Sequence, residues 1–93
     1  MVVVSLRVQF LLPGCASLKQ KRFVLASLKT KLRNRFNVAV CESDFQDKWQ
    51  RSEFGVASVA TNMRGAETVA DQVLAFFEAE PRIVVCDTAR AFY

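Results

Sequence analysis

A run of basic residues between Ser17 and Phe36 is the part of this sequence best suited to chemistry. The run contains seven lysines and arginines and no acidic residue: Lys19, Lys21, Arg22, Lys29, Lys31, Arg33 and Arg35. A helix of this composition suffers repulsion between like charges and gains no ion pairs between neighbouring turns. Basic helices on small domains are typical of proteins that bind a polyanion, although Lys and Arg are also good helix formers on any solvated face.

The charge of the whole chain is divided in the same way. Residues 1–41 hold eight bases and no acid, whereas residues 42–93 hold nine acids and five bases. The formal net charge of +4 is therefore the sum of +8 in the first part and −4 in the second. We expect the two parts of the chain to differ in electrostatic character.

Helical spacing sorts these bases into two flanks of the apolar stripe. At about 100° per residue, one flank receives Lys19, Arg22, Lys29 and Arg33, and the other receives Lys31 and Arg35. Cations spread over several turns could follow successive phosphates, and each phosphate neutralised would change the log–log salt dependence by roughly one unit. The residues predicted to contact nucleic acid are Lys19, Lys21, Arg22, Lys29, Arg33 and Arg35.

Acidic residues of a second predicted helix provide the main competing explanation. Glu67, Asp71 and Glu78 gather on one flank of that helix. If this flank adjoins the basic helix, part of the positive field is neutralised within the molecule. Exposed pairs of this kind contribute only about 0–1 kcal/mol each, but they would dilute a surface meant for RNA.

Two aromatic residues are candidates for an interface. Phe23 projects about 170° from the apolar centre of the basic helix, so it is expected to be exposed beside Lys19. It could stack on a base, fill a partner's pocket, or contact a neighbouring loop or subunit. Trp49 could contact a base or a protein, or pack at the start of a strand.

A group of acids surrounds a predicted hairpin turn, with Glu42, Asp44 and Asp47 close to Trp49 and Arg51. Carboxylates in such a group could hold a divalent cation or act as an acid and a base. Hairpin tips are commonly acidic, however, and the pattern predicts no catalytic residue, metal or cofactor.

The cysteines and the missing histidines bear on the same question. The chain has no histidine, and its cysteines form no CxxC pair, which argues against a zinc site. Cys41 and Cys86 lie inside apolar runs and are expected to be small buried hydrophobic residues.

The elements that must position these residues follow from the apolar periodicity. Residues 2–12 alternate as a strand, with Val4, Leu6, Val8, Phe10 and Leu12 on one face. Ser17 and Gln20 form a capping box that begins a helix running to about Arg35. A second strand is expected from Asn37 and a third from about Trp49 to Ala60. A second helix begins between Thr61 and Gly65 and stops at Pro81, and residues 83–88 form a fourth strand.

The order βαββαβ predicts a single α+β domain over residues 1–93 with the ferredoxin-like arrangement. In this arrangement a four-stranded antiparallel sheet has both helices on one face. The other face stays open, and its residues lack the aromatic signature of RNA-recognition domains. That face could instead form a homodimer. The apolar stretch at the start of the chain is too short to span a membrane, and Arg7 interrupts it. The chain is therefore expected to be cytoplasmic.

The stretch PGCASLKQKRFVLASLKTKLRNRFNVAVCESDFQDKWQRSEFGVASVATN resembles the YlxP-like family of small bacterial proteins. The shared pattern is the turn followed by SLKxKR, the RFNV helix exit, the E-x-D-x-x-D-x-W hairpin and the strand around Gly55. The resemblance implies a ferredoxin-like fold and genes that often lie near those for translation initiation and ribosome maturation. It implies no established activity and no catalytic residues. Gln20 stands where an acid is common in the family, and Phe23 stands where a base is common.

These observations favour a non-enzymatic protein that binds structured RNA or a ribosomal particle through its basic helix. The alternative is a homodimeric protein-interaction module with no role in nucleic-acid binding. A third possibility is an enzyme resembling acylphosphatases, which share this topology. That possibility requires a glycine-rich anion loop after the first strand, and the loop here, Pro13 to Ser17, has one glycine.

Overall fold

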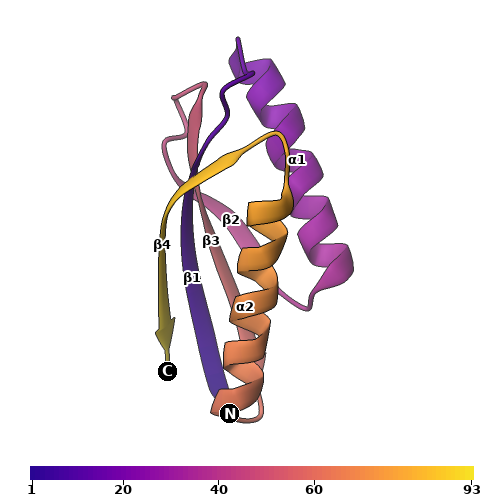
Figure 1. Ribbon diagram of the computed structural model, residues 1–93, viewed down its shortest axis with the longest axis vertical. Coiled ribbons are helices and arrows are strands. Elements are labelled where there is room, and N and C mark those ends of the chain that lie inside the picture. Colours follow the sequence, from indigo (N-terminus) through magenta and orange to yellow (C-terminus); the bar gives the residue numbers. More distant parts are fainter.

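Four strands form one antiparallel sheet, and two helices cover one of its faces (Figure 1). The computed structural model describes all residues from Met1 to Tyr93. The elements are β1 (Val2–Leu11), α1 (Leu18–Arg35), β2 (Ala39–Asp44), β3 (Arg51–Ala60), α2 (Met63–Ala79) and β4 (Val84–Phe92). The strand order is β2-β3-β1-β4, which confirms the predicted ferredoxin-like fold. Neither helix is long and apolar enough to cross a bilayer.

The core lies between the sheet and the helices, and β1 is its central strand. The alternation predicted for this strand is confirmed, because Val4, Leu6, Val8, Phe10 and Leu12 are all buried. The ring of Phe10 meets the ring of Phe54 from β3 edge-on, with centroids 5.2 Å apart. Leu25, Leu28 and Leu32 of α1 and Val73, Phe76 and Phe77 of α2 complete this core.

Local side chains set the starts of both helices. The Ser17 hydroxyl accepts a hydrogen bond from the Gln20 amide at 3.2 Å, and the Gln20 side chain accepts one from the Ala16 amide at 2.7 Å. The predicted start of α1 is thereby confirmed. Among the possible starts of α2, the structure selects Asn62, whose side chain accepts a hydrogen bond from the Gly65 amide at 2.9 Å.

Some element boundaries differ from those expected. Strand β3 begins at Arg51, so Trp49 lies in the loop before it. Strand β4 continues to Phe92 because it pairs with β1 along nearly its whole length, and this pairing has no local sequence signal. The prediction that Cys41 and Cys86 are buried is wrong, since both lie exposed on the outer strands of the sheet, and Cys15 is the buried cysteine.

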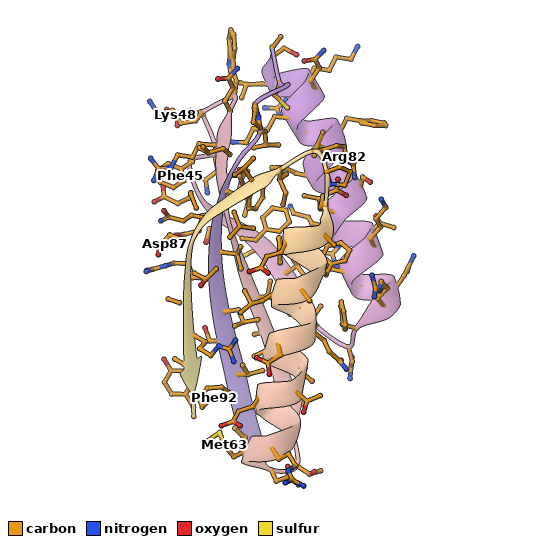
Figure 2. The ribbon with its side chains drawn as sticks, viewed as in Figure 1. Phe45, Lys48, Met63, Arg82, Asp87 and Phe92 are labelled. Carbon is orange, nitrogen blue, oxygen red and sulfur yellow. The ribbon has the colours of Figure 1, made fainter.

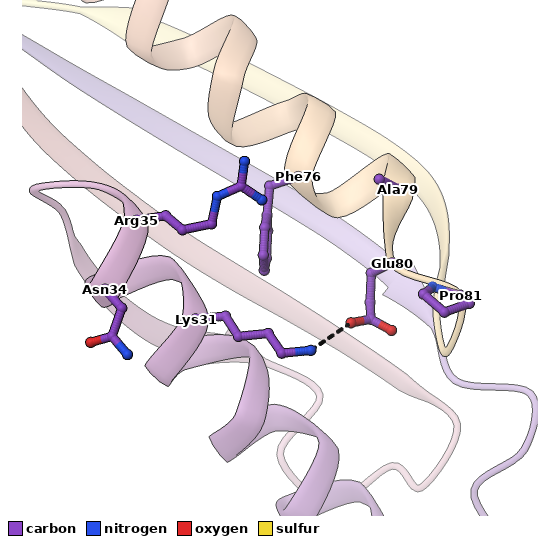
Figure 3. A pocket seen from close by; sticks show the side chains of 7 residues that line it. All are labelled: Lys31, Asn34, Arg35, Phe76, Ala79, Glu80 and Pro81. Carbon is purple, nitrogen blue, oxygen red and sulfur yellow. Dashed lines mark ion pairs between the residues drawn. The ribbon is translucent and has the colours of Figure 1, made fainter.

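A buried carboxylate fastens the end of α2 to α1 (Figure 3). Glu80 is 8% exposed, and one of its oxygens lies 3.0 Å from the Arg82 Nε atom. Arg82 also donates to the Ser27 hydroxyl at 3.1 Å, and Lys31 reaches the other Glu80 oxygen at 3.8 Å. The hydrogen bond from the Arg82 side chain is the main cause that lowers the pKa of Glu80, against desolvation, to about 2.

We expect Glu80→Gln to remove a pH-dependent part of the stability. The lowered pKa means that the carboxylate stabilises the fold fully above its ordinary value of 4.5, and that this stabilisation is lost as the pH falls toward 2. The wild type should exceed the variant by up to about 3 kcal/mol near pH 7, with the difference vanishing near pH 2. Urea unfolding at several pH values measures this. Glu78→Gln, on an exposed residue without an ion pair, is the control, and an equal effect there would contradict the assignment.

Candidate nucleic-acid interface

Four bases of α1, three of them exposed and Lys29 half-buried, form a row on the side of the helix toward β2. We call Lys19, Arg22, Lys29 and Arg33 the basic flank. The Arg33 guanidinium donates to the Val40 carbonyl of β2 at 3.4 Å, and the Lys29 ammonium lies 5.7 Å from the ring centroid of Phe54. None of these four bases takes part in an ion pair with an acid. Their positive charge is therefore not cancelled within the molecule.

The acidic flank of α2 lies away from these bases. Asp71 forms an ion pair with Arg90 of β4 at 3.1 Å, and neither Glu67 nor Glu78 forms one. Helix α2 packs on β1, β3 and β4, whereas α1 packs on β2. None of these three acids pairs with the basic flank, and Asp71 is turned toward β4 whereas Arg33 contacts β2.

The two bases on the other flank of α1 face α2 and contribute to packing between the helices. Figure 3 shows Lys31 and Arg35 on α1 reaching toward Phe76 and Glu80. Lys31 pairs with Glu80, as described above. The Arg35 guanidinium lies 5.4 Å from the ring centroid of Phe36 and 5.7 Å from that of Phe76. Arg35 therefore stands apart from the basic flank with which it was predicted to act.

Lys21 does not belong to the surface at all, which corrects its assignment as a phosphate contact. It is 1% exposed, and its ammonium lies 3.0 Å from a Glu42 oxygen and donates to the Phe45 carbonyl. The same Glu42 oxygen accepts a hydrogen bond from the Ser52 hydroxyl at 2.7 Å. A sequence signal existed, because position 21 precedes the buried Leu25 by four residues and so continues the apolar stripe inward.

The open face of the sheet carries many small residues and a buried carboxylate. Small residues surround the exposed side chain of Arg7 near the centre of this face: Ser5, Ala39, Gly55, Ala57, Ala89 and Ala91. Glu53 is 6% exposed although it faces outward, because Gln9 and Ser43 donate to its two oxygens at 2.9 and 2.7 Å. Desolvation raises the pKa of Glu53, but these hydrogen bonds and the nearby charge of Arg7 lower it below its ordinary value. No sequence pattern distinguished Glu53 from an exposed acid.

The loop between β2 and β3 brings the rings of Phe45, labelled in Figure 2, and Trp49 to the same hollow. Trp49 is 52% exposed, and the Arg51 guanidinium lies 4.3 Å from the ring centroid of Phe45. We call the hollow at this place the hairpin depression. It is lined by Leu11, Phe45, Asp47, Lys48, Trp49, Gln50 and Arg51. Sequence reasoning selected Trp49 here but missed Phe45.

The acids of this loop do not converge. Glu42 points toward α1 and pairs with Lys21, whereas Asp44 accepts a hydrogen bond from the Phe45 amide at 2.7 Å. Asp47 lines the hairpin depression. No group of three acids, histidines or cysteines has the spacing that a metal ion needs.

Phe23 lies where helical spacing predicted it. It is 73% exposed and borders a second hollow, lined also by Val24, Pro81 and Val84. This hollow is on the side of α1 toward the turn before β4, away from β2. Phe23 is therefore an exposed aromatic residue separate from the hairpin depression.

We expect Lys21→Met to destabilise the protein strongly. The substitution leaves the largely buried Glu42 carboxylate, 16% exposed, without its counter-ion, which should cost about 3–5 kcal/mol. Lys19→Met, on an exposed neighbour in the same turn of the helix, should change the free energy of unfolding by less than about 0.5 kcal/mol. Chemical denaturation compares the two variants. Adding Glu42→Leu to Lys21→Met should recover part of the loss, and equal losses in the two single variants would refute the anchoring role.

Comparison with known proteins places the chain in a family. Residues 3–90 match the family described as "Protein of unknown function (DUF503)". The chain is also similar to the uncharacterized protein YlxP of Bacillus subtilis (strain 168), with 43% identity over 67 residues, or 72% of this chain and 73% of the Bacillus protein. These matches agree with the resemblance seen in the residues from the turn at Pro13 to Asn62. The chain therefore belongs to the DUF503 family of small bacterial proteins, whose function is unknown.

Proposed function

We propose that this protein is a non-enzymatic, cytoplasmic RNA-binding protein that holds the phosphate backbone of structured RNA, such as that of a ribosomal particle, along the basic flank. The observation that supports this most is that Lys19, Arg22, Lys29 and Arg33 share one side of α1 without an acidic partner. From Lys19 to Arg33 the helix rises about 21 Å, which is long enough to follow several consecutive phosphates.

The ion pairs formed by the three least exposed carboxylates support the proposal that the protein is not an enzyme. Glu42 pairs with Lys21, Glu53 with Arg7 and Glu80 with Arg82. A general acid or base needs a carboxyl group that can exchange a proton near neutral pH. The pKa values of Glu53 and Glu80 are both lowered, which keeps these groups ionised rather than poised for proton transfer.

Titration of a structured RNA at several salt concentrations tests the basic flank. We expect Arg22→Glu to weaken binding and to reduce the log–log salt slope by about one, with a reduction of about two for Lys29→Glu with Arg33→Glu. Arg64→Glu changes the net charge as much as Arg22→Glu does, also near a helix start, but away from the flank. If Arg64→Glu weakens binding equally, or if the wild type does not bind at low salt, the proposed interface is wrong.

The open sheet face favours a second candidate function, that of a homodimeric protein-interaction module. Its small residues around Ala57 allow the backbone of a second copy to approach closely beside Arg7. Val59 and Tyr93 add exposed apolar area at the end of this face remote from the hairpin depression.

Sedimentation at micromolar concentration tests the dimer. A dimer through this face should dissociate in Ala57→Arg, because the new side chain stands among the small residues that the second copy would pack against. Ala26→Arg, on the exposed side of α1, should leave the dimer intact. A strictly monomeric wild type would remove this candidate.

A further inference from the structure

The hairpin depression combines flat ring systems with positive charge in one place. Its volume is about 570 Å³, within the range of about 300–1,000 Å³ that is common for small-ligand sites. The half-exposed indole of Trp49, the ring of Phe45 and the planar guanidinium of Arg51 all line it. Figure 2 shows Phe45 and Lys48 on the side of the sheet opposite the helices, so the depression opens away from the core.

The conformation of Phe45 is held by a contact from α1 and by contacts within the hairpin. Its φ angle is 63°, in the left-handed region that a bulky residue rarely adopts and that costs about 1–3 kcal/mol. The buried Lys21 ammonium donates to its carbonyl, the Lys48 amide donates to the same carbonyl at 3.0 Å, and Asp44 accepts from its amide. This conformation places the Phe45 ring against the Arg51 guanidinium.

Arg51 is oriented from a second direction. Its Nη2 atom donates to the Gln9 side-chain oxygen at 3.2 Å, and the Gln9 amide in turn donates to the buried Glu53 carboxylate. The plane of the guanidinium is therefore set jointly by an aromatic ring and by a hydrogen-bonded chain on the sheet. A cation held in this way requires no reordering when a flat ligand arrives.

The charges around the depression suit an anion attached to a flat ring. Lys48 and Arg51 form no ion pair with any acid. Asp47 is the one acid of the lining, and its carboxylate can accept hydrogen bonds from the amino group of a base. Exposed aromatic side chains beside cations are a common arrangement for stacking unpaired bases.

We propose that the hairpin depression binds an unpaired nucleotide of a single-stranded RNA segment. The base stacks on Trp49, its amino group faces Asp47, and its phosphate is held by Lys48 and Arg51. This site is distinct from the basic flank and goes beyond the proposed function, because it would read exposed bases rather than the backbone of folded RNA.

The chain has a single tryptophan, so its fluorescence reports on this site directly. We expect a single-stranded hexanucleotide to quench Trp49 in a saturable manner, whereas ribose 5-phosphate, which lacks the base, should not. Free N-acetyltryptophanamide measured in parallel corrects for absorption by the bases. Absence of saturable quenching by the hexanucleotide, or equal quenching by ribose 5-phosphate, would overturn the proposal.

Variants separate stacking from general attraction, with binding followed by the anisotropy of a labelled hexanucleotide. Trp49→Ala should weaken binding about 5- to 150-fold, the range expected for one stacked base. Trp49→Phe should restore most of this loss, and Phe23→Ala, which removes another exposed aromatic ring, should have no effect. Circular dichroism confirms that each variant is folded. Equal affinities of the wild type and a folded Trp49→Ala would refute the site.

The outcomes distinguish this proposal from the one above. If Lys29→Glu with Arg33→Glu abolishes binding of structured RNA but leaves the hexanucleotide quenching unchanged, both sites stand and are separate. If the hexanucleotide fails while structured RNA still binds through the basic flank, the nucleotide site alone is wrong. Quenching by a proline-rich peptide but by no oligonucleotide would identify the depression as a peptide site and refute the proposal.

Discussion

The buried ammonium group of Lys21 is the interaction on which the arrangement of α1 and the hairpin loop depends. It joins the helix to the Glu42 carboxylate of β2 and to the Phe45 carbonyl of the loop, and Glu42 is in turn bonded to Ser52 of β3. A charge removed from water must keep its partners close, because leaving it unpaired is costly. The ion pair therefore allows little freedom in how α1 is rotated over the sheet. This orientation of α1 turns the basic flank toward β2. The hydrogen bond from Lys21 to the Phe45 carbonyl helps to hold Phe45 in its left-handed conformation.

Ion pairing within the molecule also determines which basic residues remain available to bind an anionic partner. Each of the least exposed carboxylates has its own cation, and these cations come from β1, from the buried Lys21 and the α2-facing flank of α1, and from the turn after α2. Of the bases without an ion pair, four form the basic flank, and Lys48 and Arg51 lie at the hairpin depression; the others are Arg35 and Arg64. The basic flank and the hairpin depression lie on two different sides of the edge formed by β2 and its loop. An anionic polymer could therefore meet this edge from the helix side and from the open side of the sheet.

Local sequence rules predicted most of the fold, for reasons visible in particular residues. The alternation in β1 and the cap at Ser17 depend on neighbours a few residues apart, and both were predicted correctly. The burial of Lys21 also follows from local spacing, because position 21 lies four residues before Leu25 on the apolar side of the helix. It was missed because a lysine is normally expected at the surface. By contrast, the burial of Glu53 depends on Gln9 and Ser43 of the neighbouring strands. Because these partners are distant in sequence, the residues next to Glu53 do not predict its burial. The positive φ of Phe45 is set by contacts from α1 and lacks the glycine or asparagine that usually marks such a turn.

The contact between Arg33 and the Val40 carbonyl has a consequence for how this sheet meets other sheets. Strand β2 lies at the edge of the sheet, where unpaired backbone groups can recruit a strand from another chain. Arg33 occupies one of these backbone acceptors with its guanidinium and sets a row of positive charge along the edge. Two copies that approached each other through β2 would bring two such rows together. We therefore expect two copies of the sheet to pair less readily through β2 than through the opposite edge, β4.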